Sequence, residues 1–180
     1  MKESTKDNNL RGGKEMNQTL ATIKNRKSIR IFTEQKIPEE LKQEILNAAF
    51  EAPTAGAMML YSILDITDEQ LKEKLAVLCD HQTFIAKAPL ILIFLADYQR
   101  WYDAYCLAGC EPRKPGEGDF LLACADALIA AENTVIAAES LGIGSCYIGD
   151  ILENCATVRN LLDLPVYVVP AAMVVYGYPT

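Results

Sequence analysis

Three cations and a hydroxyl lie within five residues near the start of the chain, in the segment Arg26-Lys27-Ser28-Ile29-Arg30. Guanidinium groups pair with phosphate oxygens through two parallel hydrogen bonds, so this spacing could hold a small dianion. The alternative is that the cations only decorate the end of a helix, where positive charge suits the helix dipole. The local sequence leaves both interpretations open.

The surrounding chain is acidic, and this limits the ligands that such a cluster could serve. The 180 residues carry 17 Lys and Arg against 24 Asp and Glu, which gives a formal net charge of −7. Nucleic-acid scaffolds need an extended basic face, so we expect no nucleic-acid partner. A local basic pocket in an acidic protein suits a small phosphorylated ligand better.

The cysteines and the single histidine suggest little chemistry of their own. The six cysteines form no C-x-x-C pair, which disfavours a zinc ribbon or a thioredoxin-type motif. Cys106, Cys110 and Cys124 could be imagined as a metal cluster, but reduced, mostly buried thiols of a cytosolic protein fit better, and we expect no metal. His81 has no accompanying acid motif, and we expect it in a loop.

The N-terminal residues are polar and aperiodic, which predicts a flexible tail over 1–16 and a single domain over 17–180. No apolar signal-peptide core precedes Glu15. The longest apolar stretch, Phe120–Leu141, is interrupted by acidic residues that a membrane span would not tolerate. We therefore expect a cytoplasmic protein without a membrane partner.

Helices are expected at three places in the first half of the chain. A short helix from Asn17 ends in the basic cluster. Pro38 opens a second helix at a position that proline tolerates, and Pro53 ends it. Its apolar stripe is Leu41, Ile45, Ala48 and Ala49. A capping box at Thr67-Asp68-Glu69-Gln70 predicts the third helix.

Strands are expected at Tyr61–Ile66 and Leu90–Leu95. The second segment is continuously apolar, which is typical of a central strand buried on both faces. The aromatic, Gly- and Pro-rich segment Trp101–Gly118 is expected to be irregular, as a lid or a variable insertion.

A long helix is expected over Phe120–Leu141, capped by Asp119 and stopped by Gly142. It is apolar on more than one side, so we expect its second face to pack against another subunit of a symmetric dimer.

A strand at Cys146–Ile148, a helix at Leu152–Leu162 and a strand at Ala171–Tyr176 complete an α+β domain with three layers and a mixed sheet. Gly142-x-Gly144 is not a dinucleotide fingerprint, because here a helix precedes it and a strand follows.

Five segments, in their order and spacing, resemble the nitroreductase-like family of FMN-dependent NAD(P)H oxidoreductases. The resemblance runs from about Gln18 to Pro179. It implies a three-layer α-β-α fold with a mixed central sheet flanked by helices, and a homodimer with flavin at the subunit interface. The segments are Arg-Lys-Ser-Ile-Arg-Ile-Phe (26–32), Glu-Ala-Pro-Thr-Ala-Gly (51–56), Lys-Ala-Pro-Leu-Ile-Leu-Ile-Phe (87–94), Gly-Ile-Gly-Ser-Cys-Tyr-Ile-Gly-Asp-Ile (142–151) and Val-Val-Tyr-Gly-Tyr-Pro (174–179).

The resemblance also implies the cofactor-binding residues. Four residues would hold the ribityl phosphate of FMN: Arg26, Lys27, Ser28 and Arg30. A loop would reach the flavin from the other subunit: Pro53, Thr54, Ala55 and Gly56. A turn near the reactive flavin N5 and the residues lining that face would be Gly149, Asp150, Tyr147 and Ile148.

The implied activity is transfer of a hydride from NADH or NADPH to flavin N5, and from there to an acceptor such as a nitroaromatic, a quinone or a flavin. The hydride step needs no side-chain acid or base, so no catalytic residue is assigned.

The chain departs from the family pattern at three places, and two of them, the 57–59 loop and the short C-terminus, favour a second interpretation, a flavin-binding or apo homodimer with little or no turnover. Ala57-Met58-Met59 stands where the family usually carries Asn and Gln. The Asp150 carboxylate should disfavour an anionic reduced flavin. The family usually continues beyond the position of Thr180 with a basic segment. A third interpretation is a generic acidic α+β domain whose basic cluster only ends a helix.

Overall fold

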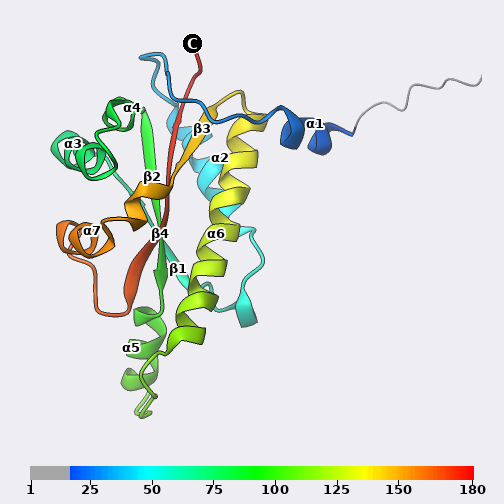
Figure 1. The fold of residues 1–180 in the computed structure, drawn as a ribbon. Coiled ribbons are helices and arrows are strands. Elements are labelled where there is room, and N and C mark those ends of the chain that lie inside the picture. The colour runs from blue at the N-terminus through cyan, green and yellow to red at the C-terminus, as the bar shows by residue number, and fades with distance from the viewer. Residues whose placement is uncertain (1–16) are drawn as a thin grey trace, which may run out of the picture.

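The computed structural model describes residues 17–180, so the tail expected at 1–16 lies outside the described residues. A four-stranded sheet lies between two layers of helices (Figure 1), and the predicted three-layer α+β architecture is confirmed. The strands pair in the order β1-β2-β4-β3. Their bounds are β1 (Tyr61–Asp65), β2 (Leu90–Asp97), β3 (Gly144–Ile148) and β4 (Val168–Gly177).

The sheet is antiparallel between all neighbouring strands, whereas we predicted a mixed sheet. A single crossover helix would return the chain to the end of the sheet where the previous strand began, and the next strand would be parallel to it. Here two helical segments connect β1 to β2, and two connect β3 to β4. The chain therefore re-enters the sheet at the end where it left, and the next strand is antiparallel. The parallel pairing among the described residues is an isolated bridge between Ser28 and Ser145.

The helices cover both faces of the sheet (Figure 1). On one face lie α2 (Glu39–Phe50) and α6 (Glu117–Ser140). On the other face lie α3 (Glu69–Leu78), α4 (Thr83–Ala86) and α7 (Cys155–Leu161).

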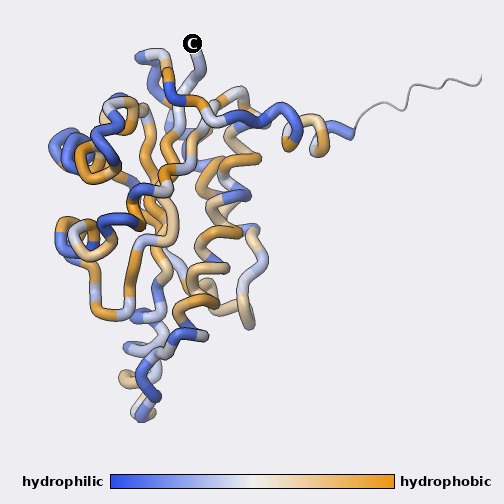
Figure 2. Tube along the Cα trace, viewed as in Figure 1, coloured by the Kyte–Doolittle hydropathy of each residue, from blue (hydrophilic) through white to orange (hydrophobic). Residues whose placement is uncertain are grey.

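The central strand β2 is buried on both sides, as its apolar run predicts. Leu92 and Phe94 pack in the core beneath α2 and α6, whereas Ile91 and Ile93 pack beneath α3 and α7. Successive strand side chains point to opposite faces, so one continuous apolar run fills two cores. Figure 2 shows hydrophobic residues concentrated along the strands, between the two helix layers.

Helix α6 packs its small side chains onto the sheet and keeps large apolar ones outside. Its alanines at 123, 127, 130, 131 and 138 are buried, whereas Leu121 and Leu128 are exposed. It is the one helix among residues 17–180 that is long and apolar enough to cross a membrane by length and composition. Its buried alanine face makes it the core helix of this layer instead.

Several helix boundaries differ from the prediction. The first part of the segment predicted to be irregular belongs to α5 (Gln99–Leu107), which has no fully buried residue; Trp101 packs only partly against the core. The cap of α3 is Asp68 rather than Thr67. The helix predicted over 152–162 is shorter, α7 running only over Cys155–Leu161, and the short helix η2 (Gly149–Leu152) comes before it. Gly142 stops α6 with a positive φ of 74°, as predicted.

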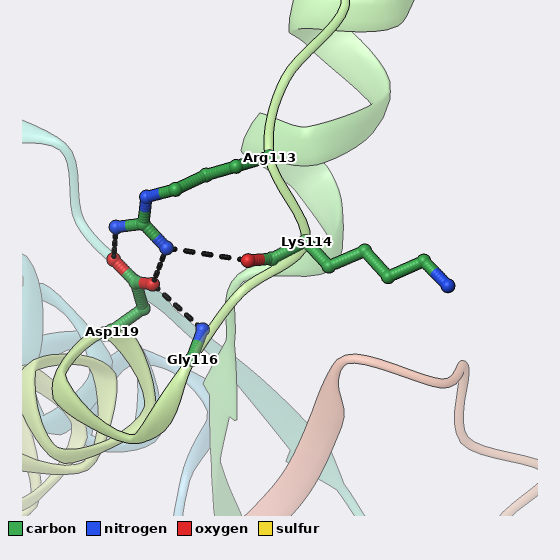
Figure 3. A network of polar contacts seen from close by, with 4 residues as sticks. All are labelled: Arg113, Lys114, Gly116 and Asp119. Atoms are coloured by element: carbon green, nitrogen blue, oxygen red, sulfur yellow. Dashed lines mark hydrogen bonds and ion pairs between the residues drawn. The ribbon is translucent and has the colours of Figure 1, made fainter.

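The start of α6 is held by Asp119 from inside the helix, not from the cap position that we predicted. Asp119 Oδ2 accepts a hydrogen bond from the Gly116 N–H at 2.8 Å, and Oδ1 accepts one from Arg113 Nη2 at 2.9 Å (Figure 3). Arg113 also donates to the Lys114 carbonyl. The guanidinium and the Gly116 N–H together hold the pKa of Asp119 below its ordinary value.

We expect Arg113→Ala to lower the stability of the fold only slightly at pH 7, because Arg113 is exposed and surface ion pairs are weak. Since the folded-state pKa of Asp119 is depressed, its contribution is present above about pH 4 and is lost as the pH falls below that value. Urea titrations at pH 7 and pH 3 measure this. The control is Lys114→Ala, whose side chain points away from the network (Figure 3). An equal loss at both pH values would contradict the assignment.

Candidate functional site

The basic segment is attached to the outer edge of strand β3. Helix α1 (Gln18–Asn25) ends where the segment begins. The Ile29 N–H then donates to the Ser145 carbonyl at 2.9 Å. The cations predicted to bind phosphate are therefore held against the sheet rather than left on a free helix end.

Gly144 is required for this attachment. A Cβ built on Gly144 would lie 2.6 Å from Ile29 Cγ1 and 3.0 Å from Ile29 Cβ, well inside van der Waals contact. The second glycine of Gly142-x-Gly144 thus makes room for the basic segment, which agrees with our rejection of a dinucleotide fingerprint.

The three cations of the segment form no ion pair with any carboxylate among residues 17–180. Lys27 and Arg30 are exposed and Arg26 is partly exposed. Ser28 and both arginines lie close to Cys146: burial raises the pKa of that thiol, and Arg30, Ser28 and Arg26 oppose the rise. A cluster of positive charges that no nearby carboxylate neutralises is suited to bind an anion.

The edge of β3 beyond Ser145 is open within the described chain. β3 pairs with β4 on its inner edge, and its recorded outer contact is the bridge to Ser28. Strand geometry points the backbone of Tyr147 to the same side as that of Ser145, which is outward. Gly149 follows Ser145 by four steps of about 3.3 Å each, so the edge extends about 13 Å from the cations to the η2 turn.

Tyr147 and Ile148 lie on opposite sides of the strand. The Tyr147 hydroxyl is near the Glu132 carboxylate of α6; burial and that carboxylate raise its pKa, and Arg26 opposes the rise. The Ile148 side chain is 2 % exposed and packs in the core beneath α3 and α7. Of the two residues predicted to line the flavin, Ile148 therefore offers its backbone alone.

The turn after β3 is tied to the end of α3. Gln82 Nε2 donates to Asp150 Oδ2 at 2.7 Å and to the Cys79 carbonyl at 3.0 Å. Burial, with Asp150 and Glu153 nearby, raises the pKa of Cys79 to about 11. Gly149 is exposed at the start of the turn.

The second predicted segment, the loop around Pro53–Gly56, is held by a buried carboxylate. Asp126 is 3 % exposed, yet both its oxygens are used. Oδ1 accepts from the Ala55 N–H at 3.0 Å and Oδ2 accepts from the Leu60 N–H at 3.1 Å. Asp126 is one of the acidic residues that interrupt the apolar stretch 120–141, and a carboxylate buried there must find hydrogen-bond donors.

Helix α5 holds the same loop from the other side. Trp101 Nε1 donates to the Met58 carbonyl at 2.7 Å, and Arg100 donates to the Met59 carbonyl. The loop backbone beside these contacts is strained: Ala57 and Met59 have φ values of 57° and 50°. Such left-handed residues cost about 1 kcal/mol or more each and cluster at functional sites.

The structure does not bring all predicted site residues together in one chain. The basic segment, Tyr147 and the η2 turn share the β3 edge. The loop instead contacts α5 and the first half of α6, and it projects beside α6 away from the basic segment (Figure 1).

Among residues 17–180, no group of three or more His, Cys, Asp or Glu side chains could hold a metal ion. All six cysteines are free; Cys79 and Cys146 are buried, and Cys106 and Cys110 are exposed. His81 lies in a turn, as predicted.

Comparison with known proteins places the chain in a family. The model of the Nitroreductase family matches residues 23–178. The FMN reductase (NADPH) of Bacillus subtilis is 34% identical over 166 residues, which cover 91% of this chain and 67% of that protein. The oxygen-insensitive NADPH nitroreductase of Salmonella typhimurium is 33% identical over 165 residues, again 91% and 67%.

The fold agrees. The structure of NfrA2 from B. megaterium superposes with a TM-score of 0.88 at 36% identity, covering 92% of this chain and 68% of that one. The chain belongs to the nitroreductase family, and the resemblance stated from its motifs is confirmed. It spans about two thirds of the length of these relatives.

We expect Gly144→Ala to destabilise the fold by about 1–3 kcal/mol, because Ile29 and the segment around it must move. Urea denaturation followed by circular dichroism measures the change. Gly118→Ala is the matched control: nothing lies within 4 Å of its added Cβ, and alanine favours the helix. If both variants behaved alike, Ile29 would not be packed on Gly144.

Proposed function

We propose that this protein is an FMN-dependent NAD(P)H oxidoreductase that passes a hydride from NADH or NADPH to a small-molecule acceptor such as a nitroaromatic, a quinone or a flavin. The observation that carries the proposal is the set of cations that have no ion-pair partner among residues 17–180 and are held at the open edge of β3. The names of its relatives, which include an FMN reductase and an NADPH nitroreductase, support the same class.

The residues present fit FMN. Arg26, Ser28 and Arg30, with Lys27, would bind its phosphate by charge-assisted hydrogen bonds. The outward backbone of Tyr147 offers hydrogen bonds along the edge of β3, and Gly149 leaves the η2 turn open at its end. When bound, FMN would supply the hydride chemistry, and the protein would bind, orient and shield it.

No side chain of the site is needed as an acid or base. His81 lies in a turn, and Asp150 is engaged by Gln82. The buried thiol of Cys146 has a raised pKa and lies beside the cations, so it contributes packing rather than a nucleophile.

We further propose that the protein acts as a homodimer in the cytoplasm, with each flavin at the subunit interface. The outer face of α6 supports the dimer: side chains opposite the buried alanines are apolar and 41–65 % exposed, namely Leu121, Leu122, Leu128 and Ile129. A contiguous apolar helix face is typical of an interface. The free cysteines suit a reducing compartment.

The function is tested by the visible absorption spectrum of the purified protein with FMN, before and after anaerobic NADH or NADPH. We expect a bound-flavin band that bleaches with one of the two nucleotides and returns on addition of an acceptor. Sedimentation of the same sample should give a dimer at micromolar concentration.

Bound flavin that never bleaches on addition of NADH or NADPH would indicate a flavin-binding protein without turnover. Absence of binding, or a monomer that binds flavin, would contradict the proposed site.

We expect Arg26→Ala to weaken FMN binding about ten- to a hundredfold, since hydrogen bonds to charged groups contribute about 1.5–3 kcal/mol. Lys27→Ala should weaken it less than about fivefold, because Lys27 is exposed and binds as a point charge. Flavin fluorescence titrations measure both, with circular dichroism as the control for folding. Equal effects would show that the cations act through net charge rather than a guanidinium pair.

A further inference from the structure

We propose that Asp126 is a positioning residue that fixes the strained segment Thr54–Leu60, so that the loop is already shaped for the flavin held by the other subunit. The proposal rests on the proposed function for its ligand. The contacts of Asp126 and of α5 with the loop are observations of this chain alone.

Asp126 is suited to this role because its two hydrogen bonds hold both ends of one short loop segment. Its oxygens accept from the N–H groups of Ala55 and Leu60, which flank the left-handed residues. Two further bonds act inside that span: Thr54 Oγ1 accepts from the Met59 N–H at 3.4 Å, and Trp101 Nε1 donates to the Met58 carbonyl. The carboxylate is buried, so the bonds are shielded from water and strengthened.

The backbone of the loop shows why such a clamp is needed. Gly56, Ala57 and Met59 all have φ between 50° and 57°, and two of the three carry side chains that disfavour this conformation. A free loop would relax toward ordinary conformations. Strain of this kind persists where the surroundings impose the shape.

The neighbouring helix face suggests where the loop is presented. Asp126 lies on α6, whose outer face is apolar and exposed at Leu122 and Ile129. The loop projects beside that helix (Figure 1). A second subunit seated on α6 would therefore meet the loop, and Asp126 would connect the helix that forms the interface to the loop that crosses it.

The first experiment is Asp126→Asn in the full chain. Both carboxylate oxygens accept from N–H groups, so either orientation of the amide places its NH₂ against a backbone donor. Trp101 is the only tryptophan of the chain and contacts Met58, so its fluorescence reports the loop. We expect a red-shifted Trp101 emission, unchanged far-ultraviolet circular dichroism and about tenfold weaker FMN binding.

The decisive test is rescue by glycine. Ala57→Gly removes the side chain that opposes φ 57°, so in the Asp126→Asn background it should restore the emission and most of the FMN affinity. The matched control is Asp163→Gly, which relieves a φ of 49° in the turn before β4. Rescue by both glycines would mean a general gain in stability, and rescue by neither would mean a structural role in the core. Either result overturns the proposal.

If Asp126→Asn fails to fold, hydrogen exchange of the unaltered protein decides the matter. The amides of Ala55 and Leu60 should then be protected in the absence of flavin. Exchange as fast as that of the Glu111 and Arg113 amides, which donate no hydrogen bond among the described residues, would refute the clamp. If the unaltered protein binds no FMN, the proposed function fails while the fluorescence and exchange results still judge the clamp. Unchanged FMN binding and emission in the variant would refute the clamp and leave the function intact.

Discussion

The site depends on one strand whose outer edge is only partly paired within residues 17–180. β3 is the last strand of the sheet, and its inner edge is fully bonded to β4. An open strand edge usually invites pairing with another chain. Here the strand is five residues long, and Ile29 occupies the start of its outer edge. What remains open is a short, rigid row of backbone groups between a cluster of cations and a turn.

That rigidity comes from the core. Cys146 and Ile148 are buried beneath the helices of one face, and Ser145 is buried as well. The strand cannot shift without opening this packing, so groups along its edge keep their positions before a ligand arrives. Binding sites on packed strands lose less free energy to ordering than sites on mobile loops.

The elements with strong periodicity could be predicted from the sequence, because burial dictates their residue types. The apolar run of β2, the Gly142 stop and the alanine-rich α6 are examples. The strand directions could not be predicted, since hydrophobicity marks a strand without orienting it. Helix α5 was missed because none of its residues is fully buried, so no strong apolar periodicity marks it.

The candidate site likewise has one part that could be predicted from the sequence and one that could not. The phosphate-type cluster at Arg26–Arg30 is visible in the sequence, because its chemistry lies in adjacent residues. The Asp126 clamp was not visible, since its partners lie 66 and 71 residues away and are backbone groups that any residue type would supply. The sequence signal was indirect: a carboxylate in an apolar helix face implies buried donors nearby.

The altered loop shows why side-chain identity alone is a poor measure of such a site. Ala57-Met58-Met59 lacks the amide side chains expected from the family resemblance, which suggested a weakened site. In the structure Met58 and Met59 pack against the core, and their carbonyls are bonded by Trp101 and Arg100. These residues therefore act through the backbone shape they maintain, and that shape is imposed by Asp126 and α5. The loop can lose two polar side chains without losing its conformation. This chain lacks the side chains, but its loop backbone is still held in place.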